Sequence, residues 1–147
     1  MRTNLPVSHK EYFFPESQLL VSTTDARGHI THCNTAFAEV SGYSYDELMG
    51  QPHNLIRHPD MPPEAFKDMW ATIGRGRPWS GTVKNRRANG DHYWVEANVT
   101  PILDNGKPVG YMSVRFRPTR EQVAAAEALY AKVAKERASG HRTFKLH

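Results

Sequence analysis

The N-terminal half of the chain alternates short apolar stretches with turn signals. β-branched residues flank an Asp-to-Gly turn at 25–28, which predicts a hairpin of two strands at 18–24 and 29–33. Asn34 then precedes a helical apolar spacing that stops at Gly42, so its side chain is expected to cap a short helix. This region is therefore predicted to fold as strand, strand and helix.

A second helix, of one turn, is predicted directly after the first. Ser44 and Glu47 have the spacing of a capping box, and Gly50 marks the stop. Prolines stiffen the following segment, 53–63, which excludes a long regular element there. A proline at the end of that segment is expected to open the longest helix of the middle region, which ends at Gly74.

The C-terminal half reads as a meander of three strands. Asn89-Gly90 predicts a two-residue turn between strands at 79–87 and 91–103, and a further turn at 104–106 leads into a strand at 108–116. In the second of these strands every other residue is apolar: Tyr93, Val95, Ala97 and Val99. One face of the strand is therefore expected to be buried.

These elements together predict an α+β fold. Hairpin connections make the sheet antiparallel, and the helices between the two groups of strands must cover one of its faces. The concave space between sheet and helices is the natural binding pocket. We divide the chain into an N-terminal arm at 1–17, a sensor-like domain at 18–118, a C-terminal helix at 119–138 and a basic, disordered tail at 139–147.

The two ends of the chain carry apolar residues that need a partner surface. In the C-terminal helix, Thr119 and Gln122 form a second capping box. The residues that follow have the spacing of a coiled-coil seam: Val123, Ala126, Tyr130 and Val133. The spacing favours a helix that leads to a neighbouring subunit or downstream module, with packing on its own sheet as the alternative. The aromatic residues 12–14 of the arm are expected to pack on the domain or on a partner subunit.

Composition narrows the function classes. A length of 147 residues with 39% apolar and 23% charged residues indicates one folded domain. The net charge of +4 is spread along the chain without a zinc-finger or similar motif, so a nucleic-acid role is not expected. The lone Cys33 and the absence of a long apolar run predict a cytoplasmic domain without a membrane span. No phosphate loop, nucleophile elbow or metalloprotease motif is present, which favours a non-enzymatic protein.

The proline-stiffened segment carries the candidate chemistry. Arg57, His58 and Asp60 lie within it, and a rigid backbone lowers the entropy cost of holding polar groups in one geometry. In the alternative interpretation, Arg57 and Asp60 pair with each other and His58 caps a backbone carbonyl, purely as structure.

The strands that face this segment supply further candidates. Asn85 and Asn98 have amides that match the paired donor and acceptor edge of a flavin, and Trp79 can wall its flat surface. Trp79 and Trp94 are equally compatible with an ordinary core.

Longer motifs resemble a known family. Residues 37–42 and 47–50 resemble the helix signature of many PAS domains. The segment 53–62, followed by 79–81 and 84–95, resembles the PAS domain of bacterial aerotaxis receptors, and the resemblance extends over about residues 5 to 133.

This resemblance implies a fold, a cofactor and partners. The family has a five-stranded antiparallel sheet with short helices on one face, binds FAD non-covalently and reports redox state to a chemotaxis kinase without turning over a substrate. It further implies that the full-length receptor carries a membrane anchor, a HAMP module and a signalling region, and forms a homodimer. By resemblance, the FAD-binding positions are Arg57, His58, Asp60, Asn34, Trp79 and Asn85.

Three rival functions remain open at this point. A haem-binding gas sensor would use His53 or His58 as axial ligand. A cofactor-free interaction domain would fill the pocket with its own side chains, and a flavoenzyme would turn over a substrate. Photoreceptor-like adduct chemistry is not expected, because the segment 53–58 lacks the required cysteine.

Overall fold

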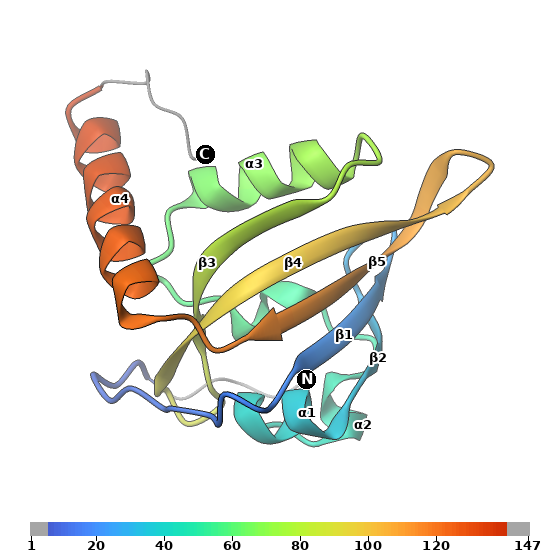
Figure 1. The fold of residues 1–147 in the computed structure, drawn as a ribbon, viewed down its shortest axis with the longest axis horizontal. Helices are drawn as coiled ribbons and strands as arrows, with labels where there is room; N and C mark the ends of the chain where they lie inside the picture. Colours follow the sequence, from blue (N-terminus) through green and yellow to red (C-terminus); the bar gives the residue numbers. More distant parts are fainter. Residues whose placement is uncertain (1–5, 141–147) are drawn as a thin grey trace.

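A single antiparallel sheet organises the structure, a computed structural model that describes residues 6–140. Within these residues the sheet has the strand order β2-β1-β5-β4-β3 (Figure 1). The strands are β1 (Leu20–Asp25), β2 (Ile30–Cys33), β3 (Trp79–Arg86), β4 (His92–Asp104) and β5 (Lys107–Phe116). The predicted five-stranded antiparallel sheet is thus confirmed.

The central pairing joins the two halves of the chain. β1 lies antiparallel to β5, from Leu20 opposite Arg115 to Asp25 opposite Gly110. These pairs are far apart in sequence, so their register is set by burial of one face of each strand and not by a connecting turn. The first hairpin and the later meander become one sheet through this contact.

Four helical elements lie between β2 and β3 in the chain, and they cover one face of the sheet. They are α1 (Thr35–Ser41), α2 (Tyr45–Leu48), the 3₁₀ turn η1 (His53–Ile56) and α3 (Pro63–Ile73). Asn34 caps α1 by accepting from the backbone N–H of Phe37, and Ser44 with Glu47 forms the predicted capping box. Local capping chemistry therefore places both short helices where the sequence predicts them.

The main core lies between these helices and the sheet. Tyr93 and Val95 of β4 are fully buried and face the helical layer, where Phe37, Leu48 and Ile56 are also buried. Full burial of each such side chain stabilises the fold by roughly 1.5–3 kcal/mol. The predicted apolar face of β4 is confirmed.

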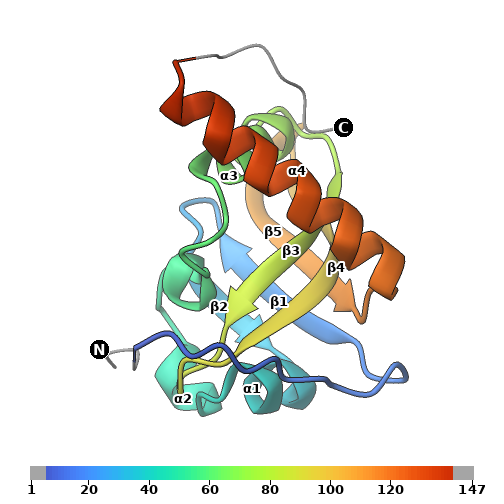
Figure 2. The ribbon, with the colours of Figure 1, turned by 90° about the vertical axis from the view of Figure 1, so that its left-hand side faces the viewer.

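The last helix, α4 (Arg120–Ala138), covers part of the opposite face (Figure 2). Trp94 points away from the main core and packs with Val123 and Ala126. The hydroxyl of Tyr130 donates to the carbonyl oxygen of Thr82 in β3 at 2.5 Å. The residues of the seam therefore pack on the chain's own sheet, where Trp94 offers an apolar surface.

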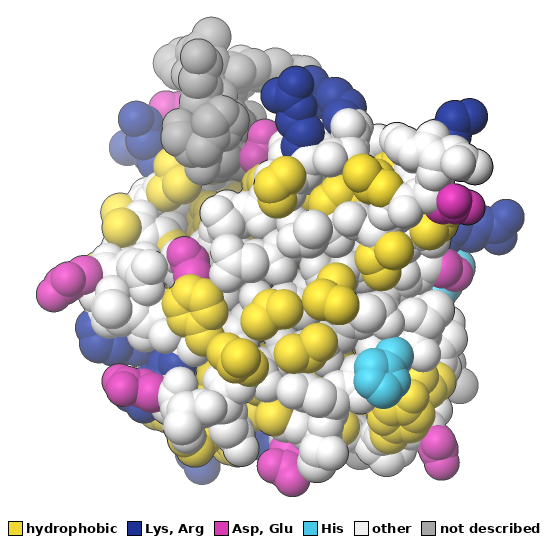
Figure 3. Space-filling view, turned by 45° about the vertical axis from the view of Figure 1, so that its right-hand side comes forward, with side chains coloured by type: hydrophobic (Ala, Val, Ile, Leu, Met, Phe, Trp, Pro, Cys, Tyr) yellow, Lys and Arg dark blue, Asp and Glu magenta, His cyan; other side chains and the backbone are white. Residues whose placement is uncertain are grey.

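The rest of that face is open. Figure 3 shows apolar side chains gathered on one side of the molecule. Ile102, Met112 and Phe116 are exposed and in phase with Trp94 on this face, whereas the exposed Leu103 and Val109 lie near the end of the β4–β5 hairpin.

The arm packs against the domain in cis. The backbone N–H of Tyr12 donates to the carbonyl of His92, and the N–H of His92 donates to the carbonyl of Lys10. Phe14 inserts into the main core and is 1% exposed. Most of the predicted tail, 141–147, lies outside the described residues.

The two turns of the C-terminal meander, β3–β4 and β4–β5, differ from each other. Asn105 and Gly106 form a two-residue turn with positive φ at both positions, between the paired Asp104 and Lys107. In the β3–β4 turn only Gly90 has positive φ, and the N–H of Arg87 donates to the carbonyl of Asp91 across three intervening residues.

The prediction of a two-residue turn at Asn89-Gly90 was therefore wrong. Ala88 is buried and its N–H donates to the carbonyl of Ser41 in α1, which draws one more residue into the loop. The Asn89 side chain accepts from the N–H of Asp91 and so stabilises the longer turn.

Because Gly90 has no side chain, the N-terminal arm can pack directly against the β3–β4 turn. An added Cβ would collide with the carbonyl oxygen of Pro6, whereas Gly106 has open space around the same position. Gly106→Ala should cost only the strain of a positive φ, about 1–2 kcal/mol. Gly90→Ala should lower the free energy of unfolding further in urea titrations and speed tryptic cleavage at Lys10. Equal effects of the two substitutions would contradict this packing of the arm.

Candidate functional site

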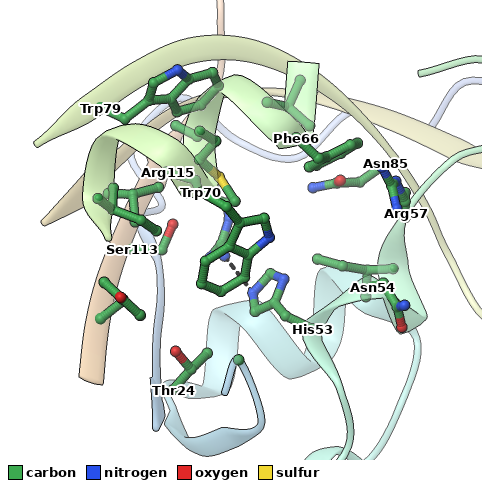
Figure 4. A pocket seen from close by; sticks show the side chains of 18 of the residues that line it. Thr24, His53, Asn54, Arg57, Phe66, Trp70, Trp79, Asn85, Ser113 and Arg115 are labelled. Atoms are coloured by element: carbon green, nitrogen blue, oxygen red, sulfur yellow. Dashed lines mark hydrogen bonds between the residues drawn. The ribbon is translucent and has the colours of Figure 1, made fainter. Parts of the chain in front are cut away.

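A cavity of about 270 Å³ lies between the concave face of the sheet and the helical layer (Figure 4). β1, β3, β4 and β5 supply one side, while η1 and α3 supply the other. Among its lining residues, Arg27, Asn54 and Trp70 are exposed at the surface and so mark the mouth. The space is therefore a pocket that is open at one end.

Aromatic rings form much of the pocket wall. Trp70 of α3 contacts Tyr111 of β5 edge-to-face, with ring centroids 5.4 Å apart. Trp79 lines the pocket and its indole N–H donates to the Asp68 carboxylate at 2.9 Å, which fixes the orientation of the ring. Such surfaces suit a flat aromatic ligand.

The β3 edge carries a polar wall. Asn85 is 4% exposed and lines the cavity. Arg57 forms an isolated antiparallel bridge with Asn85, so the segment after η1 runs along the edge of β3. The Arg57 guanidinium lies 3.9 Å from the centroid of the Phe66 ring, and this contact holds it at the cavity wall.

The opposite wall carries a buried arginine. Arg115 of β5 is 3% exposed and donates to His53 Nε2 at 2.6 Å and to Ser22 Oγ at 3.0 Å. Because a guanidinium only donates, Nε2 of His53 must be the acceptor, and the ring is neutral with its proton on Nδ1. Burial, together with the charge of Arg115, lowers the pKa of His53 to about 3.

Three of the predicted site residues line the cavity: Arg57, Trp79 and Asn85. His58 and Asp60 do not, because His58 follows Arg57 in extended backbone and so points away from the pocket, and Asp60 lies in the turn that comes next. His58 is 2% exposed and accepts from the N–H of Asp60 at 3.0 Å, and Asp60 pairs with Lys84 at 2.8 Å.

Asn34 does not line the cavity either. Its side-chain oxygen accepts from the N–H groups of Val21 and Phe37, and its amide donates to the carbonyl of Leu19. The side chain thus joins α1 to the start of β1. Asn98, the other candidate amide, is exposed on the opposite face of β4, because it is out of phase with the buried Val95 and Ala97.

Sequence reasoning missed the β5 wall. Tyr111, Ser113 and Arg115 all line the cavity and alternate along one strand. The same period of two that identifies the face of β4 would have placed them on one face of β5. An arginine in phase with core positions was the available signal for a polar site.

Comparison with known proteins places the chain in a class. A sequence profile described as the PAS fold matches residues 30–115. A solved light-oxygen-voltage domain studied with a flavin analogue superposes with a TM-score of 0.66 at 20% identity, covering 82% of this chain and 90% of that one. The dark structure of the Aureochrome1 light-oxygen-voltage domain gives a TM-score of 0.65 at 22% identity, covering 79% and 84%. The chain belongs to the PAS fold family.

Curated relatives narrow the class further. The aerotaxis receptor of Escherichia coli (strain K12) is 61% identical over 111 residues, which is 76% of this chain and 22% of that protein. A nitrogen fixation regulatory protein of Klebsiella pneumoniae is 34% identical over 103 residues, covering 68% and 21%. The chain thus spans about a fifth of the length of these relatives. The predicted similarity to the PAS domain of an aerotaxis receptor is confirmed.

The buried His58 gives a pH prediction. Burial and the nearby Lys84 charge lower its pKa to about 4, so from pH 6.5 down to about 4 the unfolded chain binds a proton that the native chain does not. This residue should therefore reduce the free energy of unfolding as the pH falls through that window, by up to about 1.4 kcal/mol per pH unit. His58→Asn keeps an acceptor for the Asp60 N–H. In urea titrations at a series of pH values, its free energy of unfolding should therefore fall less steeply with decreasing pH than that of the parent chain. Identical slopes for both proteins would refute this.

Proposed function

We propose that this chain is the FAD-binding sensor domain of an aerotaxis receptor and that it converts the redox state of the flavin into a conformational signal. The observation that carries the proposal is the pocket itself, in which aromatic walls face the buried amide of Asn85 and the guanidinium of Arg57. The 61% identity to the Escherichia coli aerotaxis receptor supports the same assignment.

The size of the pocket suits one part of the ligand. Pockets for drug-sized ligands enclose about 300–1,000 Å³, so about 270 Å³ suits one flat ring system and not a whole dinucleotide. We assign the interior to the isoalloxazine ring, with Asn85 at its donor and acceptor edge and Trp79 in the wall. The remainder of FAD would extend through the mouth, where Arg27 and Arg57 offer positive charge to its diphosphate.

The other candidate residues act from outside the pocket in this proposal. His58 and Asp60 would hold the segment that presents Arg57, through Lys84 on β3. Asn34 would hold α1 against β1. We propose a binding role and not a catalytic one, since the bound flavin supplies the redox chemistry and the side chains only position it.

A haem-binding alternative fits the pocket less well. His53 Nε2 is engaged by Arg115 at 2.6 Å, and His58 does not line the cavity. The cavity also speaks against a cofactor-free domain whose pocket is filled by its own side chains. Cys33 is buried and does not line the pocket, so adduct chemistry has no nucleophile among the lining residues.

The signal has a direct route out of the pocket. Val83 and Asn85 line the cavity from β3, and the carbonyl of Thr82 on the same strand accepts the hydrogen bond of Tyr130 in α4. A shift of β3 would therefore change the position or stability of α4. HAMP and kinase-control modules, dimerisation and a membrane anchor would belong to the rest of the receptor. Among residues 6–140, no helix has the length and apolar character to cross a bilayer.

Flavin binding is tested by replacing two asparagines of the sheet, one that lines the pocket and one that does not. Purified chain should be yellow and should release FAD on denaturation. Asn85→Ala should weaken FAD binding at least about fivefold, because a buried hydrogen-bonding group contributes about 1–3 kcal/mol. Asn98→Ala, on the exposed face of β4, is the matched control and should bind FAD like the parent chain. A colourless chain that cannot be reconstituted with FAD would overturn the proposal.

The route to α4 is tested by hydrogen exchange. Amide protection of α4 should differ between the oxidised and reduced flavin-loaded chain. Tyr130→Phe removes the hydrogen bond to Thr82 and keeps the ring, so it should reduce that difference while FAD binding stays intact. If the difference is the same in Tyr130→Phe, the signal does not pass through this contact.

A further inference from the structure

Arg115 is a buried cation without an acidic partner. Its side chain is 3% exposed, and no ion pair within residues 6–140 includes it. Its hydrogen-bond acceptors, His53 Nε2, Ser22 Oγ and the carbonyl of Leu20, are all neutral groups. A charge removed from water is costly unless an opposite charge compensates it, so this arrangement is unusual for a purely structural residue.

The neighbours of Arg115 compensate its charge only in part. The guanidinium lies 4.9 Å from the centroid of the Phe37 ring, which gives a weak cation–π contact. His53 acts as a neutral acceptor and so adds no negative charge. The hydrogen bonds to His53 and Ser22 fix the orientation of the guanidinium without neutralising it.

The charged residues that line the pocket are all positive, like Arg115. The lining includes Arg27, Arg57 and Arg115 but no aspartate or glutamate. Figure 4 shows Arg115 and His53 joined by their hydrogen bond at the pocket wall, next to the ring of Trp70. Water screens charges near the mouth more strongly than charges in the interior, so Arg115 dominates the field at an enclosed ligand.

We propose that Arg115 makes this pocket bind the anionic, reduced ring system of its ligand more tightly than the neutral, oxidised one. The inference rests on the proposed FAD-binding function and deepens it. An electron taken up from an external reductant adds one negative charge to the oxidised ring. The buried guanidinium stabilises that charge directly, so no proton needs to follow the electron. His53 and Ser22 are positioning residues, since they hold the guanidinium.

The experiment compares four flavin-loaded proteins: the parent chain, Arg115→Gln, Arg115→Lys and Arg117→Gln. Each is reduced anaerobically with dithionite in the presence of a reference dye, and the potential of the first electron is measured with the absorption spectrum. Arg117 contacts Phe13 outside the cavity, so Arg117→Gln makes the same change of net charge away from the ligand. FAD affinity of the oxidised proteins is measured separately.

Loss of the buried charge should change both the potential of the first electron and the absorption spectrum of the reduced form. In Arg115→Gln the ratio of affinities for the reduced and oxidised flavin should fall at least about tenfold, which corresponds to about 59 mV for one electron. Its one-electron-reduced form should be the blue, protonated species, whereas the parent chain and Arg117→Gln should give the red anion. Arg115→Lys keeps the charge and should remain closer to the parent chain.

The outcomes separate this inference from the proposed function. If Arg115→Gln binds FAD with the potential and colour of the parent chain, the assignment of Arg115 is wrong while FAD binding stands. If the parent chain binds no flavin, both fall.

A measurement on the parent chain keeps the test independent of folding in the variants. Bound 8-hydroxy-FAD, whose ring hydroxyl ionises, should have its pKa lowered by at least about one unit relative to free probe, a tenfold preference for the anion. An unchanged or raised pKa of the probe would overturn the inference.

Discussion

The pairing of β1 with β5 is the contact on which the rest of the structure depends. It joins segments from opposite ends of the domain, and its register places Arg115 opposite Leu20 and within hydrogen-bond distance of Ser22. The same register brings Arg115 to His53, 62 residues away along the chain. A slip by one residue would turn the guanidinium to the solvent face and leave the pocket without its buried charge.

The β3 edge imposes a second constraint. Arg57 pairs with Asn85 there, and the alternation of an extended segment sends Arg57 into the pocket and His58 away from it. Because Thr82 on the same strand contacts Tyr130, the strand that contributes to the pocket also holds α4. The cavity and α4 are thus linked through one strand, and a displacement of β3 need not cross the core to reach α4.

The buried polar groups of the pocket oppose stability. A neutral His53, a guanidinium without a carboxylate and an open cavity each cost free energy that a sealed apolar core would not. The buried apolar residues Phe37, Leu48, Tyr93 and Val95, of which Val95 also lines the pocket, offset this cost. Polar groups in core positions are expected where a protein binds a ligand and not merely where it folds.

The sequence by itself determined the features that depend on a few neighbouring residues. Caps at Asn34 and Ser44, the strand alternation of β4 and the order of elements follow from local hydrogen bonding and side-chain period. Only the tertiary structure decided the loop around Ala88, the packing of α4 on Trp94 and the meeting of Arg115 with His53. Those contacts join segments distant in the chain, and their energies depend on register and burial, which no local window of sequence contains.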